Sequence, residues 1–199
     1  YNSTMVKQVE TPPKAPARVP RSRAKVGHPT KESRQQALSD VRRSLILDAA
    51  RAVFFEHGLE GTSVREIARR AGYTPGAIYS YFASKEEVYG ALLSESLDRL
   101  NAQVDAANKS AEDSPKEVVH RTAEAFFGFY RENPRDLDLG FYLFQGMQPR
   151  GLTPALNERL NERLRASLSH AQEAMTTLGM KPDEALAEVT ALFAHAVGF

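Results

Sequence analysis

The sequence predicts an all-α fold. Apolar residues recur at helical spacing along nearly the whole chain, and no alternating strand pattern interrupts them. The expected helix starts and ends also carry the Ser, Thr, Pro and Gly residues that cap helices. At 199 residues, the chain is long enough for a small domain joined to a larger one.

Two helices are predicted before residue 73. The first has one apolar face and ends at Gly58, with its apolar positions at i, i+3, i+4, i+7 and i+8: Ile46, Ala49, Ala50, Val53 and Phe54. The second begins with Ser63 and Glu66, whose spacing is typical of a capping box, and Gly72 closes it.

The third predicted helix is short and the fourth is long. Thr74 is the expected N-cap of the third, with Pro75 at its first position, and this helix ends at about Phe82. Ser84 and Glu87 repeat the capping box and open the fourth helix. The rest of the chain predicts helices over about 114–133, 135–145, 153–178 and 181–199, the last still running where the sequence stops.

Charge is distributed unevenly along the chain. Residues 1–34 hold eight basic and two acidic side chains, a net charge of +6, together with five prolines. Such a segment buries too little apolar surface to offset its ordering entropy, so residues 1–38 are expected to be a disordered basic arm. The remainder from Gln35 has a net charge of −5. This asymmetry favours a polyanionic partner for the arm, and the alternative is a solubilising tail.

Residues 63–82 have the spacing of a helix-turn-helix unit. Ile78 and Phe82, four positions apart, form the inward side of the third helix. The other side carries small residues that allow close approach to base edges, and hydroxyl groups that can reach phosphate oxygens: Thr74, Gly76, Ala77, Tyr79, Ser80 and Tyr81. An ordinary helical hairpin is the alternative that periodicity alone leaves open.

The run from Thr62 to Glu87 resembles the DNA-binding motif of TetR-family transcriptional regulators. Its specific parts are Ile-Ala-x-x-Ala-Gly at 67–72, Tyr-x-Tyr-Phe at 79–82 and Ser-Lys-Glu-Glu at 84–87. The resemblance extends over about residues 42–100. It implies a helix-turn-helix domain over 39–90 and a helical ligand-binding and dimerisation domain over 91–199 that lacks the family's last helix.

The resemblance also implies which residues contact DNA. Base contacts are expected from Arg65, Pro75, Gly76 and Ala77. Phosphate contacts are expected from Thr62, Ser63, Thr74, Tyr79, Tyr81 and Lys85. Half-buried packing is the alternative for the two tyrosines, and capping or loop hydrogen bonding is the alternative for Thr62. Residues 39–90 carry seven basic and seven acidic side chains, so the basic arm is expected to add phosphate or minor-groove contacts.

A cluster of aromatic residues marks the second domain. In a family that binds apolar or aromatic inducers, such a cluster could line a ligand cavity, and the alternative is a packed core. The candidate lining residues are Phe126, Phe127, Tyr130, Phe141, Tyr142, Phe144 and Met147. The family's partners are double-stranded operator DNA, a small apolar or aromatic inducer and a second copy of the chain.

Other classes of function find little support. The chain has no cysteine, no HxxxH pair, no phosphate-binding Gly-Lys loop and no nucleophile elbow. We therefore expect no catalytic residues, no metal and no cofactor. No apolar run is long enough to span a bilayer, and the expected location is the cytoplasm, at the nucleoid. The predicted function is a ligand-released repressor. An activator of the same fold, or a helical interaction module without DNA binding, remains the alternative.

Overall fold

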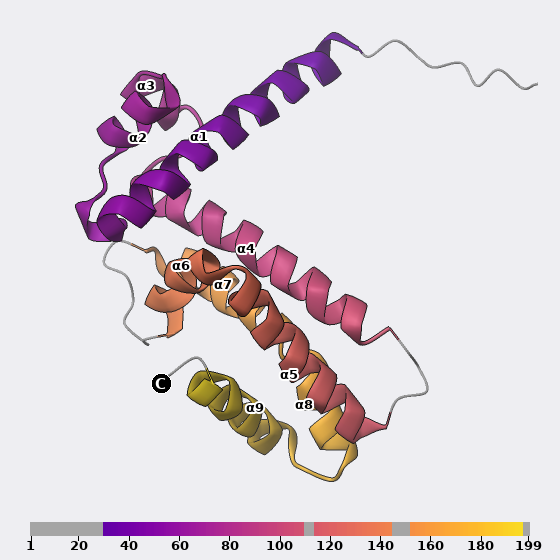
Figure 1. The fold of residues 1–199 in the computed structure, drawn as a ribbon. Coiled ribbons are helices and arrows are strands. Elements are labelled where there is room, and N and C mark those ends of the chain that lie inside the picture. The colour runs from indigo at the N-terminus through magenta and orange to yellow at the C-terminus, as the bar shows by residue number, and fades with distance from the viewer. Residues whose placement is uncertain (1–29, 110–113, 145–151, 197–199) are drawn as a thin grey trace, which may run out of the picture.

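The computed structural model describes residues 30–109, 114–144 and 152–196, and every regular element in these ranges is an α-helix (Figure 1). The N-terminal part contains α1 (Lys31–Gly61), α2 (Val64–Ala71), α3 (Pro75–Tyr79) and α4 (Lys85–Ala107). The C-terminal part contains α5 (Pro115–Glu132), α6 (Pro134–Phe144), α7 (Pro154–Ala166), α8 (Ser169–Thr177) and α9 (Pro182–Ala196). The all-α prediction is confirmed.

Helices α1, α2 and α3 form a small unit, which we call the reading head. The N-terminal half of α1 projects beyond its neighbours, and α2 and α3 lie on one side of this helix (Figure 1). Ile67 and Ile78 are fully buried between the three helices, and Phe82 is 4% exposed. The inward orientation of Ile78 and Phe82 that the sequence predicts is therefore confirmed.

Helices α4 to α9 form a larger unit, which we call the body. Helix α4 runs beneath α1 and continues along α5 and α7 (Figure 1). Its buried residues belong to one apolar core that extends from the reading head to α9: Val88, Tyr89, Leu92, Leu93, Leu97, Leu100 and Val104. Gly90 allows α7 to approach closely, because a Cβ atom there would lie 2.8 Å from both Cδ atoms of Leu156.

Helix α1 begins earlier than the sequence predicts. The sequence places residues 31–38 in the disordered arm, whereas in the structure they form the first turns of α1. The physical reason is local: residues 31–45 contain neither proline nor glycine, and the Oγ1 of Thr30 accepts a hydrogen bond from the N–H of Ser33 at 3.1 Å. Residues 1–29 of the predicted arm lie outside the described residues.

Two other helix boundaries differ from the prediction. Helix α3 ends at Tyr79 and not near Phe82, and a turn follows it. The helix predicted over 153–178 is two helices, α7 and α8, separated at Ser167 and Leu168. The Ser167 hydroxyl is buried and donates to the carbonyl of Leu164 at 2.6 Å, a bond of the kind that bends helices.

The predicted N-caps at Ser63 and Ser84 are present, but neither of the two predicted capping boxes is complete, whereas the start of α5 has a complete one. Ser114 accepts from the N–H of Glu117, whose carboxylate accepts in return, and these bonds lower the pKa of that carboxyl. Ser63 and Ser84 each accept the expected backbone bond. The glutamate partner of Ser63 turns toward His57 instead, and that of Ser84 accepts from the N–H of residue 83.

Among the described residues, none of the helices combines the length and the apolar character that crossing a bilayer requires.

Candidate nucleic-acid interface

The turn between α2 and α3 sets the angle of the third helix. Gly72 has φ 73° and ψ 27°, the left-handed conformation that glycine adopts without strain. Its N–H closes the end of α2, and the N–H of Tyr73 donates to the carbonyl of Ala68 at 2.9 Å. Thr74 then caps α3 by accepting from the N–H of Ala77 at 3.3 Å. Helix α3 is thereby held by its buried side, with its other side turned to solvent.

The solvent side of α3 is open, as the sequence predicts. Tyr79 is 56% exposed, an unusual position for so large a ring. Its exposed neighbours around the start and outer side of the helix are Thr74, Pro75, Gly76 and Ser80. Ala77 is partly exposed, and Tyr81 is half-buried against the core. This surface joins a rigid aromatic ring, hydroxyl groups and small residues at the N-terminus of a helix, the features that a major-groove reader uses.

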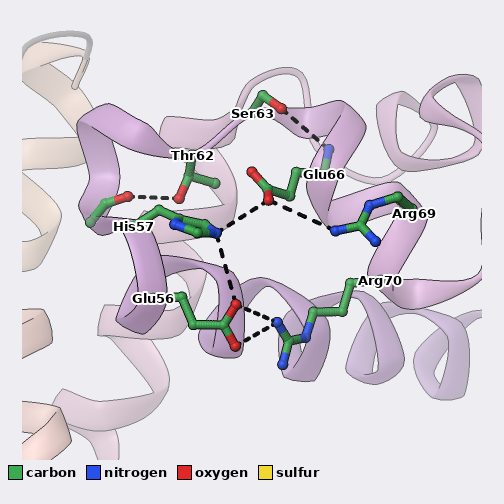
Figure 2. A network of polar contacts seen from close by, with 8 residues as sticks. Glu56, His57, Thr62, Ser63, Glu66, Arg69 and Arg70 are labelled. Carbon is green, nitrogen blue, oxygen red and sulfur yellow. Dashed lines mark hydrogen bonds and ion pairs between the residues drawn. The ribbon is translucent and has the colours of Figure 1, made fainter.

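Helix α2 is held against α1 by a network of charged side chains (Figure 2). Arg70 donates to both carboxylate oxygens of Glu56, at 2.6 and 2.7 Å. His57 lies 3.2 Å from the carboxylate of Glu66, which also lies 3.9 Å from Arg69. Both bonds to Glu56 come from Nη1 of Arg70, and together with the contact between His57 and Glu66 they hold α2 against α1.

Arg65 is the arginine of α2 that this network leaves available. It is exposed, and within the described part of the chain no carboxylate pairs with it. Arg69 and Arg70 carry the same charge, but Glu66 and Glu56 neutralise them. The base-contacting role that the resemblance implies for Arg65 therefore remains a prediction with a compatible geometry.

Two residues expected to contact phosphate make hydrogen bonds within the protein, and their contacts with DNA stay a prediction. Thr62 is 4% exposed, and its hydroxyl donates to the carbonyl of Gly58 at 2.6 Å. The Nζ of Lys85 donates to three carbonyls at the end of α1, at 2.8 to 3.3 Å: Leu59, Glu60 and Thr62. In this structure both side chains close the end of α1, and Ser63, which is exposed, serves as the N-cap of α2.

The network around Glu56 and His57 was missed at the level of sequence. Glu56 and Arg70 are 14 positions apart and lie on different helices. No helical i,i+4 spacing connects them, so only the packing of α2 on α1 brings them together.

The aromatic rings of the cluster that the structure describes pack against one another. The ring of Phe126 lies 5.9 Å from that of Phe127, 5.1 Å from that of Tyr130 and 4.4 Å from that of Phe193 in α9. Burial raises the pKa of the Tyr130 hydroxyl above its ordinary value, and the negative charge of Asp136 raises it further. The side chains of Phe141, Tyr142, Phe144 and Met147 lie outside the described residues, so the ligand cavity stays a prediction.

The body also holds one buried hydroxyl without a partner. Ser96 of α4 is 1% exposed, and its Oγ makes no hydrogen bond among the described residues. In the same ranges, His, Asp and Glu side chains form no group of three that could hold a metal ion.

Comparisons with known proteins agree with this geometry. Residues 46–92 match the family model described as bacterial regulatory proteins, tetR family. The transcriptional activator FasR of Mycolicibacterium smegmatis is 34% identical over 102 residues, which cover 51% of this chain and 46% of that protein. The transcriptional repressor KstR2 of Mycobacterium tuberculosis is 48% identical over 62 residues, 31% of each chain. The chain thus spans less than half the length of either relative.

Solved structures extend the likeness beyond the reading head. A tetR-family regulatory protein from Rhodococcus RHA1 has a TM-score of 0.62 and 23% identity, over 78% of this chain and 83% of that one. FadR from Bacillus subtilis, solved with stearoyl-CoA, has a TM-score of 0.62 and 22% identity, over 77% and 84%. At such identities the likeness establishes the fold, an N-terminal helix-turn-helix part followed by a helical body.

Proposed function

We propose that the chain, whose residues 46–92 match the family model of tetR-family bacterial regulatory proteins, is a sequence-specific DNA-binding transcriptional regulator. The observation that carries this proposal is the outer side of α3. It stays open around the 56% exposed ring of Tyr79, while Ile78 anchors the same helix in the core. A helix that served only packing would not present its N-terminus and a large ring to solvent.

The DNA contacts are assigned from exposure. Arg65 is the proposed reader of a base edge, with Pro75, Gly76 and Ala77 lying close to the floor of the major groove. The hydroxyls of Ser63, Thr74, Tyr79 and Ser80 are the proposed phosphate ligands. Tyr81 is proposed at the edge of this surface, since it is half-buried. Thr62 and Lys85 are proposed to support this surface indirectly, through their hydrogen bonds to the backbone at the end of α1.

We propose that residues 39–90 form the DNA-binding domain and that the helices after them sense a ligand and form a homodimer. A palindromic operator requires a two-fold protein, because its half-sites are related by a two-fold axis. Exposed apolar side chains near the C-terminal end of the described chain support this assignment, with Leu178 55% and Leu192 42% exposed.

The proposed ligand is a small apolar or aromatic molecule held in the body. Support comes from the aromatic rings gathered on α5 and α9. FadR from Bacillus subtilis was solved with stearoyl-CoA, an apolar chain on a polar carrier. A ligand that binds the DNA-free geometry better would lower operator affinity by the same factor. Ligand-released repression is our proposal, with activation as the second candidate, since the relatives include both.

The test is a gel shift with the DNA that adjoins the protein's own gene. The wild-type chain should retard this DNA and should not retard unrelated DNA of equal length at the same concentration. Tyr79→Phe removes one proposed hydroxyl–phosphate bond and keeps the ring. We expect it to weaken binding about three- to tenfold, the value of one hydrogen bond. Failure of the wild-type chain to retard the DNA would favour an interaction module.

A further inference from the structure

A cleft lies where the reading head meets the body. Its volume is about 500 Å³, within the range of small-molecule sites. Its lining includes Arg43 of α1, Phe82, which follows α3, Arg159 of α7, and Glu87 and Ser94 of α4. The cleft is separate from the aromatic cluster of α5 and α9.

The acidic side chains of this cleft are already engaged. Each of its three carboxylates has a partner: Asp98 with Arg163, Glu95 with Arg51 at 3.3 Å, and Glu87 with the backbone N–H of Ala83 at 2.9 Å. These bonds neutralise or occupy the negative groups. The charges of Asp98 and Glu95 are thus paired with arginines, whereas Glu87 keeps its negative charge beside a single backbone N–H.

Two arginines of the cleft remain without a carboxylate among the described residues. The guanidinium carbon of Arg43 lies 4.8 Å from the centroid of the Phe82 ring, a cation–π contact that holds the group against the cleft wall. Arg159 is exposed on α7, and no described residue forms an ion pair or hydrogen bond with it. The two positive charges belong to opposite parts of the protein, one to the reading head and one to the body.

We propose that this cleft binds a small organic dianion whose anionic oxygens are held by the two arginines. Guanidinium groups bind carboxylates and phosphates in bidentate geometry, so a dicarboxylate or a phosphate ester shares the required chemistry. A dianion so held would join α1 to α7 and fix the reading head relative to the body.

An effect on operator affinity follows from this site, and that consequence rests on the proposed function. A ligand that bridges Arg43 and Arg159 favours the head-to-body arrangement in which both arginines line the cleft. The ligand would therefore change operator affinity, by at most the factor by which it binds that arrangement more tightly than other arrangements of the reading head and the body.

The test is isothermal titration calorimetry on the DNA-free full chain with three probes. Terephthalate carries two carboxylates, phenyl phosphate carries a phosphate ester, and benzoate is the monoanionic control. Saturable binding of either dianion, at least tenfold tighter than that of benzoate, is the expected result, and the stronger of the two identifies the anionic group. If neither dianion binds saturably at concentrations up to about 10 mM, an affinity too weak for a specific site, the proposal is overturned.

Matched variants locate the binding. Arg159→Gln should lower the affinity for the dianion at least tenfold. Arg165→Gln, an exposed arginine on the same helix that does not line the cleft, should leave its affinity within twofold. Equal affinities in the two variants would overturn the assignment. A gel shift with and without the dianion is read separately, so that binding of the dianion without any DNA retardation would refute the proposed function and leave the cleft intact.

Discussion

At residue scale, Gly72 and Gly76 show how two glycines of one motif serve different purposes. Gly72 has a φ of 73°, and a Cβ atom there would meet nothing within 4 Å. Gly76 lies inside α3, on its exposed surface, and the nearest atom to a Cβ would be the Oγ1 of Thr74 at 4.0 Å. Gly72 is therefore needed for the left-handed backbone conformation of the turn, and Gly76 leaves room at the surface proposed to contact DNA.

Gly72→Ala should lower the free energy of unfolding by about 1 kcal/mol, because a side chain is strained in the left-handed region even where space is free. Gly76→Ala should unfold at the same urea concentration as the wild type or slightly higher, since alanine favours a helix. It should nevertheless weaken operator binding, because its methyl group stands between α3 and the base edges. Equal stability of both variants would contradict this distinction.

Several residues of the candidate interface were predictable from sequence because their roles are local. The cap at Thr74, the proline after it and the glycine at 72 all act within a few positions along the chain. The bond of Thr62 to the carbonyl of Gly58, four positions earlier, is the loop hydrogen bonding given as its alternative, whereas the orientation of Lys85 was not predictable in the same way. The Nζ of Lys85 reaches carbonyls 23 to 26 positions earlier, which only the folded arrangement brings near.

At the scale of elements, the order and approximate limits of the helices follow from apolar spacing and caps. The division of α7 from α8 does not, because Ser167 is compatible with a helix interior and bends the chain only through its bond to Leu164. The early start of α1 was not apparent from composition, because the segment after Thr30 is polar. The same segment consists of good helix formers, and these allow the helix to begin there.

The contact between Lys85 and the end of α1 joins two helices and can be tested. Lys85→Met removes the donor to three carbonyls, so the free energy of unfolding should fall by about 1 kcal/mol, because water can replace only some of these bonds. Lys116→Met, at an exposed position in α5, is the control and should unfold like the wild type in urea. Wild-type stability of Lys85→Met with a reduced salt dependence of DNA binding would instead assign the lysine to phosphate.

At the scale of the whole molecule, charge is segregated between the N-terminal segment and the rest of the chain. Residues 1–29 carry six basic side chains and one acidic side chain. If they neutralise phosphates, their deletion should flatten the plot of log K against log salt by about 0.9 for each phosphate that they neutralise. Fluorescence anisotropy with operator DNA at several salt concentrations measures this slope. An unchanged slope would leave the segment without a part in DNA binding.

Assembly is the second property of the whole molecule. Leu192 is 42% exposed on α9, next to Phe193, which is buried in the core. If α9 lies at the proposed dimer surface, Leu192→Glu should shift the chain toward monomers in sedimentation velocity, because a charge would be buried at the interface. Thr190→Glu, at an exposed position on the same helix, provides a comparison for a general effect of added charge. A dimer that tolerates Leu192→Glu would place the interface elsewhere.

Helix α4 contributes buried side chains to both the reading head and the body, from Val88 near its start to Val104 near its end. We therefore expect the reading head and the body to unfold together, because both pack against α4. Differential scanning calorimetry should record one endotherm whose calorimetric and van't Hoff enthalpies agree. Damage to distant packing in the body would then deplete folded reading heads as well, and would reduce occupancy of DNA without altering a single contacting residue.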